Sequence, residues 1–151
     1  MATLYIVATP IGNLEDITLR ALRVLAEVDV IFCEDTRTTR VLLERYKIKT
    51  ATESFHAKSP LSKIDHIIEL LQSGKNLALV SDAGTPCISD PGMLLVAEVR
   101  KQSPDTSMAA IPGASALTAA ISIAGKPLHE FVFLGFLPHK KGRKTLFEEI
   151  R

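Results

Sequence analysis

The residues best suited to chemistry lie in four short segments rich in glycine, proline or polar side chains. These segments are residues 9–13, 34–37, 81–92 and 112–116. Each follows a short apolar run that is typical of a buried strand, and the carboxyl ends of parallel strands meet at one edge of a sheet. Small residues also let a backbone approach a ligand and bind it through N–H and C=O groups. The pattern therefore predicts one cleft for a small polar ligand.

The third segment carries the most information, because it holds two Asp-containing turns, SDAGTP and SDPG. We expect Asp82 and Gly84 to contact the ligand, although Asp82 could also serve only to make the turn. Asp90 is expected to cap the helix that begins at Pro91. The segments contain no phosphate-binding G-x-x-x-x-G-K-[ST] pattern. They also lack G-x-G-x-x-G, because the first turn carries only Gly12.

Two adjacent carboxylates, Glu34 and Asp35, are candidates for proton transfer. A substrate hydroxyl becomes a better nucleophile when a base within hydrogen-bond reach accepts its proton. The competing interpretation is that Asp35 caps the helix beginning at Thr36 and that Glu34 pairs with a nearby arginine. For catalysis we favour this structural interpretation, since much of the acceleration of a group transfer can come from positioning the substrates.

Basic residues gather in two places that could hold phosphates. Arg37 and Arg40 lie three residues apart, on one face of a predicted helix. A denser run, HKKGRK, contains Lys140, Lys141, Arg143 and Lys144. Each group could contact an RNA backbone, or could be a solvated helix face or linker.

These residues require a framework of alternating strands and helices. Strands are predicted at 4–8, 30–33, 77–80, 108–111 and 131–134, and helices at 17–28, 36–46, 61–73, 92–99, 114–124 and from 143 onward. Ser59 is expected to cap the helix after Pro60. Continuous apolar strands between helices indicate an α/β fold with a mostly parallel five-stranded sheet and helices on both faces.

Composition narrows the class of protein. The 151 residues carry a net charge of +1, with 46% hydrophobic and only 5% aromatic residues. These values exclude a disordered chain, a globally basic nucleic-acid binder and an aromatic base-stacking platform. Cys33 and Cys87 show no metal-ligand spacing, so we expect no metal and a reducing, cytoplasmic setting. The longest apolar stretch is interrupted by Pro112 and Gly113, so we expect no membrane span.

Several motifs together closely resemble the ribosomal RNA small subunit methyltransferase I family of tetrapyrrole-methylase-like enzymes. They are YIVATPIGN, TLRALRVL, CEDTR, LVSDAGTPCISDPG, IPGASA and FLGFLP. The resemblance implies S-adenosyl-L-methionine-dependent 2′-O-methylation of a cytidine ribose in small-subunit ribosomal RNA, free or in the assembled subunit. It also implies a homodimer whose protomers have two α/β domains with the cofactor between them.

Carried over residue by residue, the resemblance assigns cofactor contacts to segments at the carboxyl edge of the sheet. They are Pro10, Asp82, Ala83, Gly84, Thr85, Ser115, Ala116, Leu134, Gly135, Phe136 and Leu137. It implies a cofactor-binding domain over residues 1–138, followed at 139–151 by a linker and the start of a truncated second domain. The alternatives are a tetrapyrrole-type small-molecule methylase and a non-catalytic ligand-binding module.

Overall fold

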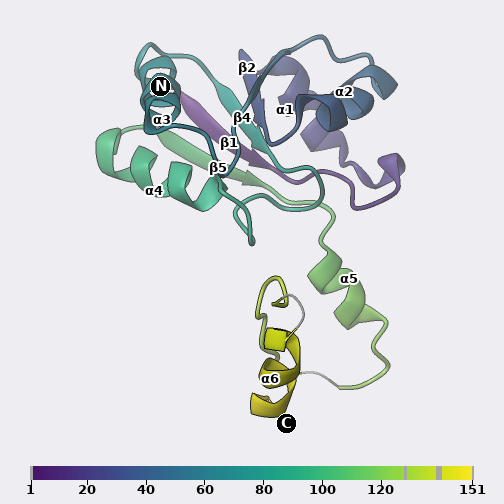
Figure 1. Ribbon diagram of the computed structural model, residues 1–151. Coiled ribbons are helices and arrows are strands. Elements are labelled where there is room, and N and C mark those ends of the chain that lie inside the picture. The colour runs from purple at the N-terminus through teal and green to yellow at the C-terminus, as the bar shows by residue number, and fades with distance from the viewer. Residues whose placement is uncertain (1, 128, 139–140, 151) are drawn as a thin grey trace.

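A computed structural model describes residues 2–127, 129–138 and 141–150. Its centre is a sheet of five parallel strands in the order β3-β2-β4-β1-β5 (Figure 1). The strands are β1 (Thr3–Val7), β2 (Val30–Cys33), β3 (Ala51–Ser54), β4 (Leu77–Val80) and β5 (Ser107–Ile111). The predicted α/β class with a parallel five-stranded sheet is therefore confirmed.

Helices cover both faces of this sheet. The helices are a short 3₁₀ helix (Leu14–Asp16), α1 (Leu19–Glu27), α2 (Thr36–Arg45), α3 (Leu61–Gln72), α4 (Gly92–Gln102), α5 (Ala116–Ser122) and α6 (Lys141–Glu149). One apolar cluster joins α1 and α2 to the sheet through Val24, Leu42 and Ile31, among others. A second joins α3 and α4 to the opposite face through Ile67 and Leu95. Both central strands β2 and β4 are buried along their whole length, which explains their uninterrupted apolar sequences.

One strand prediction is wrong. The described backbone of residues 131–134 forms no strand, and the fifth strand is instead β3, with the sequence ATES. β3 lies at the edge of the sheet, where it pairs only with β2, so it needs few apolar side chains. The apolar run FVFL is typical of a buried strand, yet its residues are 47–82% exposed. Burial in the sheet therefore does not explain why the run FVFL is apolar.

Capping side chains explain where several helices begin. The Thr18 hydroxyl accepts a hydrogen bond from the N–H of Ala21 (3.0 Å), which places the start of α1 at Leu19 rather than Ile17. The expected cap of α3 is wrong, because its N-cap is Pro60 and has no capping side chain. The hydroxyl of Ser59 instead accepts from the N–H of His56 (2.9 Å) and closes the turn before the helix.

The buried core extends from Ala2 to Ile111. Among the described residues after Ile111, every side chain of known burial is exposed or half-buried. Figure 1 shows α5 and α6 outside the layered body formed by the sheet and the four preceding helices. Within the described ranges, no helix combines the length and hydropathy needed to cross a membrane. The layered body is thus the scaffold that holds the segments at the carboxyl edge.

The packing of α3 yields a direct stability prediction. Ile67 is 0% exposed, whereas Leu61 on the same helix is 78% exposed. Ile67→Ala is expected to lower the free energy of unfolding by about 2–5 kcal/mol, because it removes buried methyl groups and leaves a cavity. Leu61→Ala is the matched control and should change it by less than about 0.5 kcal/mol. Urea unfolding measures both values, and equal effects would contradict the assigned packing.

Candidate ligand cavities at the carboxyl edge

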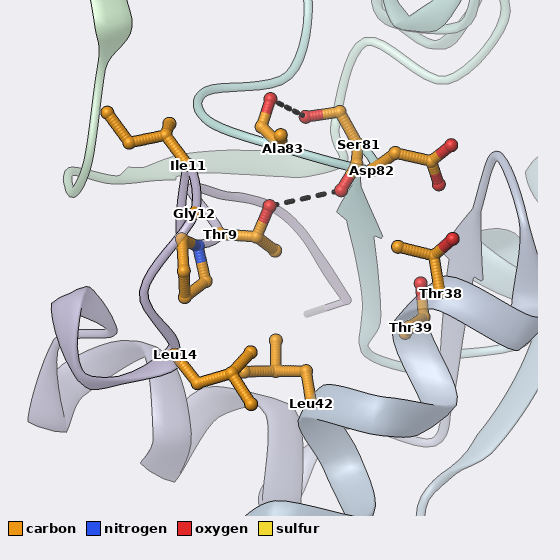
Figure 2. Close-up of a pocket in the computed structure, with 11 residues that line it drawn as sticks. Thr9, Ile11, Gly12, Leu14, Thr38, Thr39, Leu42, Ser81, Asp82 and Ala83 are labelled. Carbon is orange, nitrogen blue, oxygen red and sulfur yellow. Dashed lines mark hydrogen bonds between the residues drawn. The ribbon is translucent and has the colours of Figure 1, made fainter.

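The loops after β1 and β4 are tied together across the carboxyl edge of the sheet. Thr9 and Gly84 form an isolated antiparallel bridge, in which each N–H donates to the other residue's carbonyl oxygen (2.9 and 3.0 Å). The buried Thr9 hydroxyl also donates to the carbonyl oxygen of Ser81 (3.0 Å; Figure 2). These bonds satisfy backbone groups beyond the strand ends and fix the relative positions of the two loops.

Two glycines permit this arrangement for different reasons. Gly84 has φ +79°, a region that L-residues rarely adopt, and a Cβ there would lie 3.3 Å from Ile11 Cγ2. At Gly113, after β5, a Cβ would lie 2.9 Å from the Cβ of Ala8, so this glycine allows close packing against the end of β1. Gly113 therefore has a structural explanation, while Gly84 keeps an open surface beside Ile11.

The predicted single cleft is in fact two cavities that share a wall. The first has a volume of about 290 Å³ and lies between the β1 loop, the β4 loop and α2 (Figure 2). It is lined by Thr9, Pro10, Ile11, Gly12, Leu14, Thr38, Thr39, Leu42, Ser81, Asp82 and Ala83. Its lining combines an apolar floor with hydroxyl groups and one carboxylate. This combination suits a ligand with both apolar and hydrogen-bonding parts.

The second cavity has a volume of about 330 Å³ and lies between the β4 loop, the start of α5 and residues 133–136. It is lined by Ile11, Ala83, Gly84, Thr85, Ile88, Ser89, Ser115, Ala116, Leu117, Phe133, Gly135 and Phe136. Ile11 and Ala83 line both cavities and form the wall between them. The Thr85 hydroxyl donates to the carbonyl oxygen of Ala114 (3.4 Å), which links two sides of the second cavity.

Most residues that the resemblance assigns to the cofactor meet at the second cavity. They are Ala83, Gly84, Thr85, Ser115, Ala116, Gly135 and Phe136. Pro10 and Asp82 line the first cavity instead, and Leu134 and Leu137 line neither.

Sequence reasoning also missed several lining residues. Ile88 and Ser89 belong to the long SDAGTPCISDPG motif, which could have indicated them, whereas the role of Thr38, Thr39 and Leu42 depends on how α2 is placed. Ser89 has φ +64°, and backbone strain of this kind is often found at ligand sites.

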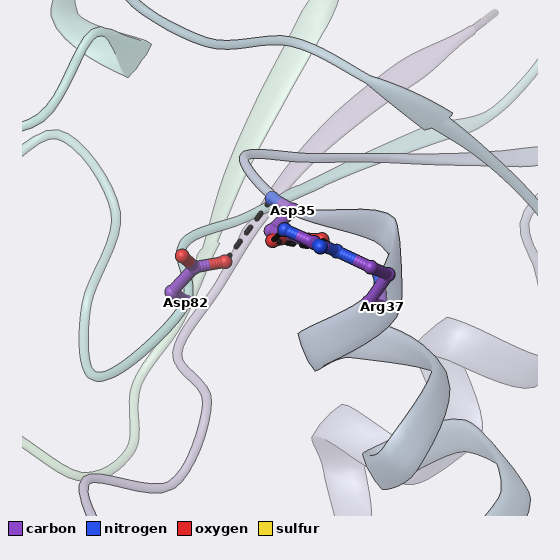
Figure 3. A network of polar contacts seen from close by, with 3 residues as sticks. All are labelled: Asp35, Arg37 and Asp82. Carbon is purple, nitrogen blue, oxygen red and sulfur yellow. Dashed lines mark hydrogen bonds and ion pairs between the residues drawn. The ribbon is translucent and has the colours of Figure 1, made fainter.

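Asp82 connects the β4 loop to the loop after β2. Its Oδ1 accepts a hydrogen bond from the N–H of Asp35 (3.1 Å), as Figure 3 shows. The carboxylate therefore has a structural partner in addition to its place in the first cavity. Asp90 is not the expected N-cap, because the N-cap of α4 is Pro91, which has no capping side chain. The Oδ1 of Asp90 instead accepts from the N–H of Gly92 (2.7 Å), the first residue of α4.

The two carboxylates proposed for proton transfer differ in environment. Asp35 is the N-cap of α2, where it accepts from the N–H of Arg37 (2.8 Å) and pairs with the Arg37 guanidinium (2.6 Å; Figure 3). These contacts hold the pKa of Asp35 at about 2. The capping interpretation is thus confirmed, and Arg37 pairs with Asp35 rather than with Glu34.

Glu34 is half-buried and lies near two other carboxylates. Burial raises the pKa of Glu34, and the charges of Asp82 and Asp90 raise it further, while the backbone of Asp82 opposes the shift by hydrogen bonding. Glu34 therefore retains its proton to a higher pH than an exposed glutamate. A carboxylate with a raised pKa is a better proton acceptor than one held near 2.

The cysteines do not look like nucleophiles. Burial raises the pKa of the Cys33 thiol, and burial with the charge of Asp90 raises the pKa of the Cys87 thiol to about 11. Both thiols are therefore protonated at neutral pH. Across the described ranges, no group of three or more His, Cys, Asp or Glu side chains is arranged to hold a metal ion.

The predicted phosphate contacts are scattered. Arg40 is exposed on α2, and Arg143 and Lys144 are exposed on α6, where Lys144 pairs with Glu148 (3.8 Å). Lys140 lies outside the described residues. Lys141 is the first residue of α6, and the structure does not describe its side chain.

Comparisons with known proteins agree with the fold. The profile of the family described as Tetrapyrrole (Corrin/Porphyrin) Methylases matches residues 3–150. The chain therefore belongs to the tetrapyrrole methylase family.

Its curated relatives are more specific. The chain is 49% identical, over its whole length and 67% of the relative, to the Ribosomal RNA small subunit methyltransferase I of Thermotoga maritima. It is 50% identical, over 95% of the chain and 64% of the relative, to the protein of the same name from Mycoplasmopsis pulmonis. It thus spans about two thirds of the length of these relatives.

A solved structure supports the fold alone. The uroporphyrin-III-C-methyltransferase of Thermus thermophilus superimposes with a TM-score of 0.62 at 23% identity. The match covers 85% of this chain and 55% of that one.

The environment of Glu34 predicts a pH-dependent stability. Below the pKa that Glu34 has in the unfolded chain, its carboxyl is protonated in both the folded and the unfolded state. Above that pKa, the carboxyl ionises more readily in the unfolded chain, because folding raises its pKa. The wild-type chain therefore loses stability as pH rises through the interval between the two pKa values. Glu34→Gln should raise the free energy of unfolding at pH 7–8 and leave it nearly unchanged near pH 4.

Denaturant titrations at several pH values measure this difference. Glu69→Gln, on the exposed face of α3, is the matched control for the change in net charge. A Glu34→Gln gain that persists at pH 4, or that Glu69→Gln reproduces, would contradict the assigned environment.

Proposed function

We propose that the protein is an S-adenosyl-L-methionine-dependent methyltransferase acting on small-subunit ribosomal RNA, with the second cavity as the cofactor site. The observation that carries this proposal is the identity of 49% over the whole chain with a ribosomal RNA small subunit methyltransferase I. The second cavity supports it, because seven of the eleven residues carried over from the family motifs line it together.

The second cavity has the size and chemistry that such a cofactor requires. Its volume of about 330 Å³ lies within the range of small-molecule sites. Ile88, Leu117 and Phe133 supply apolar surface, while the backbone around Gly84 and Ser115 supplies hydrogen-bonding groups. The missing side chain at Gly84 keeps the wall open, because a Cβ would fill the space beside Ile11.

The first cavity is the proposed site of the methyl acceptor, since it adjoins the second across Ile11 and Ala83. S-adenosylmethionine supplies an electrophilic methyl group, and the family resemblance points to the ribose 2′-hydroxyl of a cytidine as its acceptor. The C–S bond breaks as the O–C bond forms, S-adenosylhomocysteine leaves, and the hydroxyl proton passes to a base.

Glu34 is the better of the two candidate bases, because the pKa of Asp35 is about 2 and its carboxylate is already bound by Arg37. Glu34 lines neither cavity, so we assign most of the acceleration to positioning of the substrates.

A small-molecule methylase is the second candidate, because the superimposable solved structure is named for a uroporphyrin methyltransferase. Its 23% identity supports only the fold, against 49% for the ribosomal RNA enzyme. Methyl transfer from labelled S-adenosylmethionine to small ribosomal subunits, but not to uroporphyrinogen, is the result expected of the first candidate. The reverse result would establish the second.

Residues 1–138 are proposed as the cofactor-binding domain, with a second α/β domain beginning after a linker at residue 139.

Self-association of the protein into a homodimer is proposed as well. Exposed apolar side chains on α4 (Met93 and Leu94) and at Val132 and Phe136 leave surface that a second copy could cover. Sedimentation equilibrium should give twice the protomer mass, and a monomer over a wide concentration range would contradict this.

Cofactor binding tests the assigned cavity. Gly84→Ala, in the protein at its full natural length, should weaken S-adenosylhomocysteine binding at least about tenfold, or about 1.4 kcal/mol. The added Cβ strains a backbone at φ +79° and intrudes beside Ile11. Calorimetric titration measures the affinity, and the wild-type protein should show no heat with ATP or NAD.

Gly125→Ala is the matched control for backbone strain. Gly125 has φ +66°, but a Cβ there meets nothing within 4 Å. Its binding should equal that of the wild-type protein. Unchanged affinity in Gly84→Ala would remove the β4 loop from the cofactor site, and heat with ATP or NAD alone would support a non-catalytic binding module instead.

A further inference from the structure

One short stretch of the layered body carries a marked excess of positive charge. Residues 37–49, RTTRVLLERYKIK, contain five of the 18 basic residues and a single acidic residue, Glu44. Because the whole chain carries only +1, the remainder is net negative. This stretch forms α2 and the connection to the edge strand β3.

Four of these basic side chains are available to an external anion. Arg37 is held by Asp35, as described above. Arg40, Arg45, Lys47 and Lys49 are exposed and form no ion pair with any side chain that the structure describes. We call these four residues the α2 basic face.

A groove lies against two of these four residues. It has a volume of about 220 Å³ and lies between α2 and β3, with Arg40 and Lys49 among its lining residues. Half-buried Thr50 and Thr52 also line it, and Glu44 contributes one opposing charge. The outer edge of β3 adjoins the groove and pairs with no strand of the described sheet. The groove thus offers hydroxyl and backbone groups beside two cations.

Lys47 occupies a position where glycine would be the ordinary choice. It follows the end of α2 with φ +56°, its N–H donates to the Glu44 carbonyl (3.1 Å), and the N–H of Ile48 donates to the Leu43 carbonyl (2.9 Å). This pair of bonds is the Schellman motif, in which the left-handed residue is usually glycine. A lysine is strained there, because in this conformation its Cβ lies too close to the following carbonyl oxygen.

Helix α2 joins the basic face to the site. Thr38, Thr39 and Leu42 line the first cavity, whereas Arg40 and Leu43 line the groove. A polyanion lying on the outer side of α2 would therefore pass within one helix diameter of the proposed acceptor cavity.

We propose that the α2 basic face binds the sugar–phosphate backbone of the RNA substrate and so presents one nucleotide to the first cavity. This inference rests on the proposed function, because it takes ribosomal RNA as the substrate. Phosphates match the four cations, and the Thr52 hydroxyl can donate to a sugar or phosphate oxygen, whereas the Thr50 hydroxyl already donates to the Leu25 carbonyl (2.6 Å).

Removal of three of these charges tests the face. Arg40→Gln, Lys47→Gln and Lys49→Gln, combined in the protein at its full natural length, should weaken binding of small-subunit ribosomal RNA at least about tenfold at 0.1 M salt. The slope of log K against log salt should fall by about 0.7 for each phosphate that the variant no longer neutralises. S-adenosylhomocysteine affinity should not change, because none of the three residues lines the second cavity.

A matched triple variant controls for net charge. Lys75→Gln, Arg100→Gln and Lys126→Gln remove three exposed cations from elsewhere on the chain. This control should keep wild-type RNA binding and salt slope. If the wild-type protein methylates ribosomal RNA and both triple variants bind it equally, the α2 basic face does not bind the RNA, while the proposed function stands. A wild-type protein that binds the RNA through this face without methylating it would overturn the proposed function alone, and one that binds no RNA would overturn both.

Lys47 alone provides a test that loss of folding cannot imitate. Lys47→Gly should raise the urea midpoint of unfolding, because glycine adopts φ +56° without strain. The same variant should weaken RNA binding and lower the salt slope by about 0.7. A more stable protein that binds RNA as tightly as the wild type would show that Lys47 makes no phosphate contact.

Discussion

The Thr9–Gly84 bridge is the constraint on which the site depends. The strands of a parallel sheet end at one edge, and the loops that leave it need partners for their backbone groups. Here two such loops pair with each other, and the Thr9 hydroxyl adds a bond to Ser81. The bridge places Ile11 beside Ala83, and these two residues separate the two cavities. The two cavities can therefore adjoin without merging into one open cleft.

The framework could be predicted from sequence because its signals are local. β2 and β4 are continuous apolar runs, and α3 repeats its apolar residues at helical spacing. The fifth strand could not be found this way. β3 is polar because only one of its edges is paired, whereas the apolar residues 131–134 stay exposed and only Phe133 among them lines the second cavity. An apolar side chain can face a ligand cavity instead of packing in a sheet, so an apolar run alone does not identify a strand.

Sequence motifs predicted only part of the candidate site. The motifs identified the β4 loop and the start of α5, which do meet at the second cavity. They did not reveal that Asp82 binds the backbone of Asp35, because those residues are 47 positions apart. Nor could they show that Gly113 is needed for packing against Ala8 while Gly84 keeps a cavity open. Such distinctions depend on distances between loops, which a motif does not contain.

Acidic side chains lie at the N-terminal end of α2 and basic side chains lie further along it, and this separation affects how a polyanion can approach. Its N-terminal end lies beside Glu34, Asp35 and Asp82, with Arg37 neutralised by Asp35, while the cations of the α2 basic face lie further along the helix. Phosphates are repelled by the carboxylates and attracted by the basic face. A strand held on that face would keep its backbone outside the acidic rim, and only a nucleoside turned out of the strand could enter the first cavity. Burial raises the pKa of Glu34, and the charges of Asp82 and Asp90 raise it further. The acidic end of α2 therefore both repels phosphates and holds a carboxyl that keeps its proton to a higher pH than an exposed glutamate.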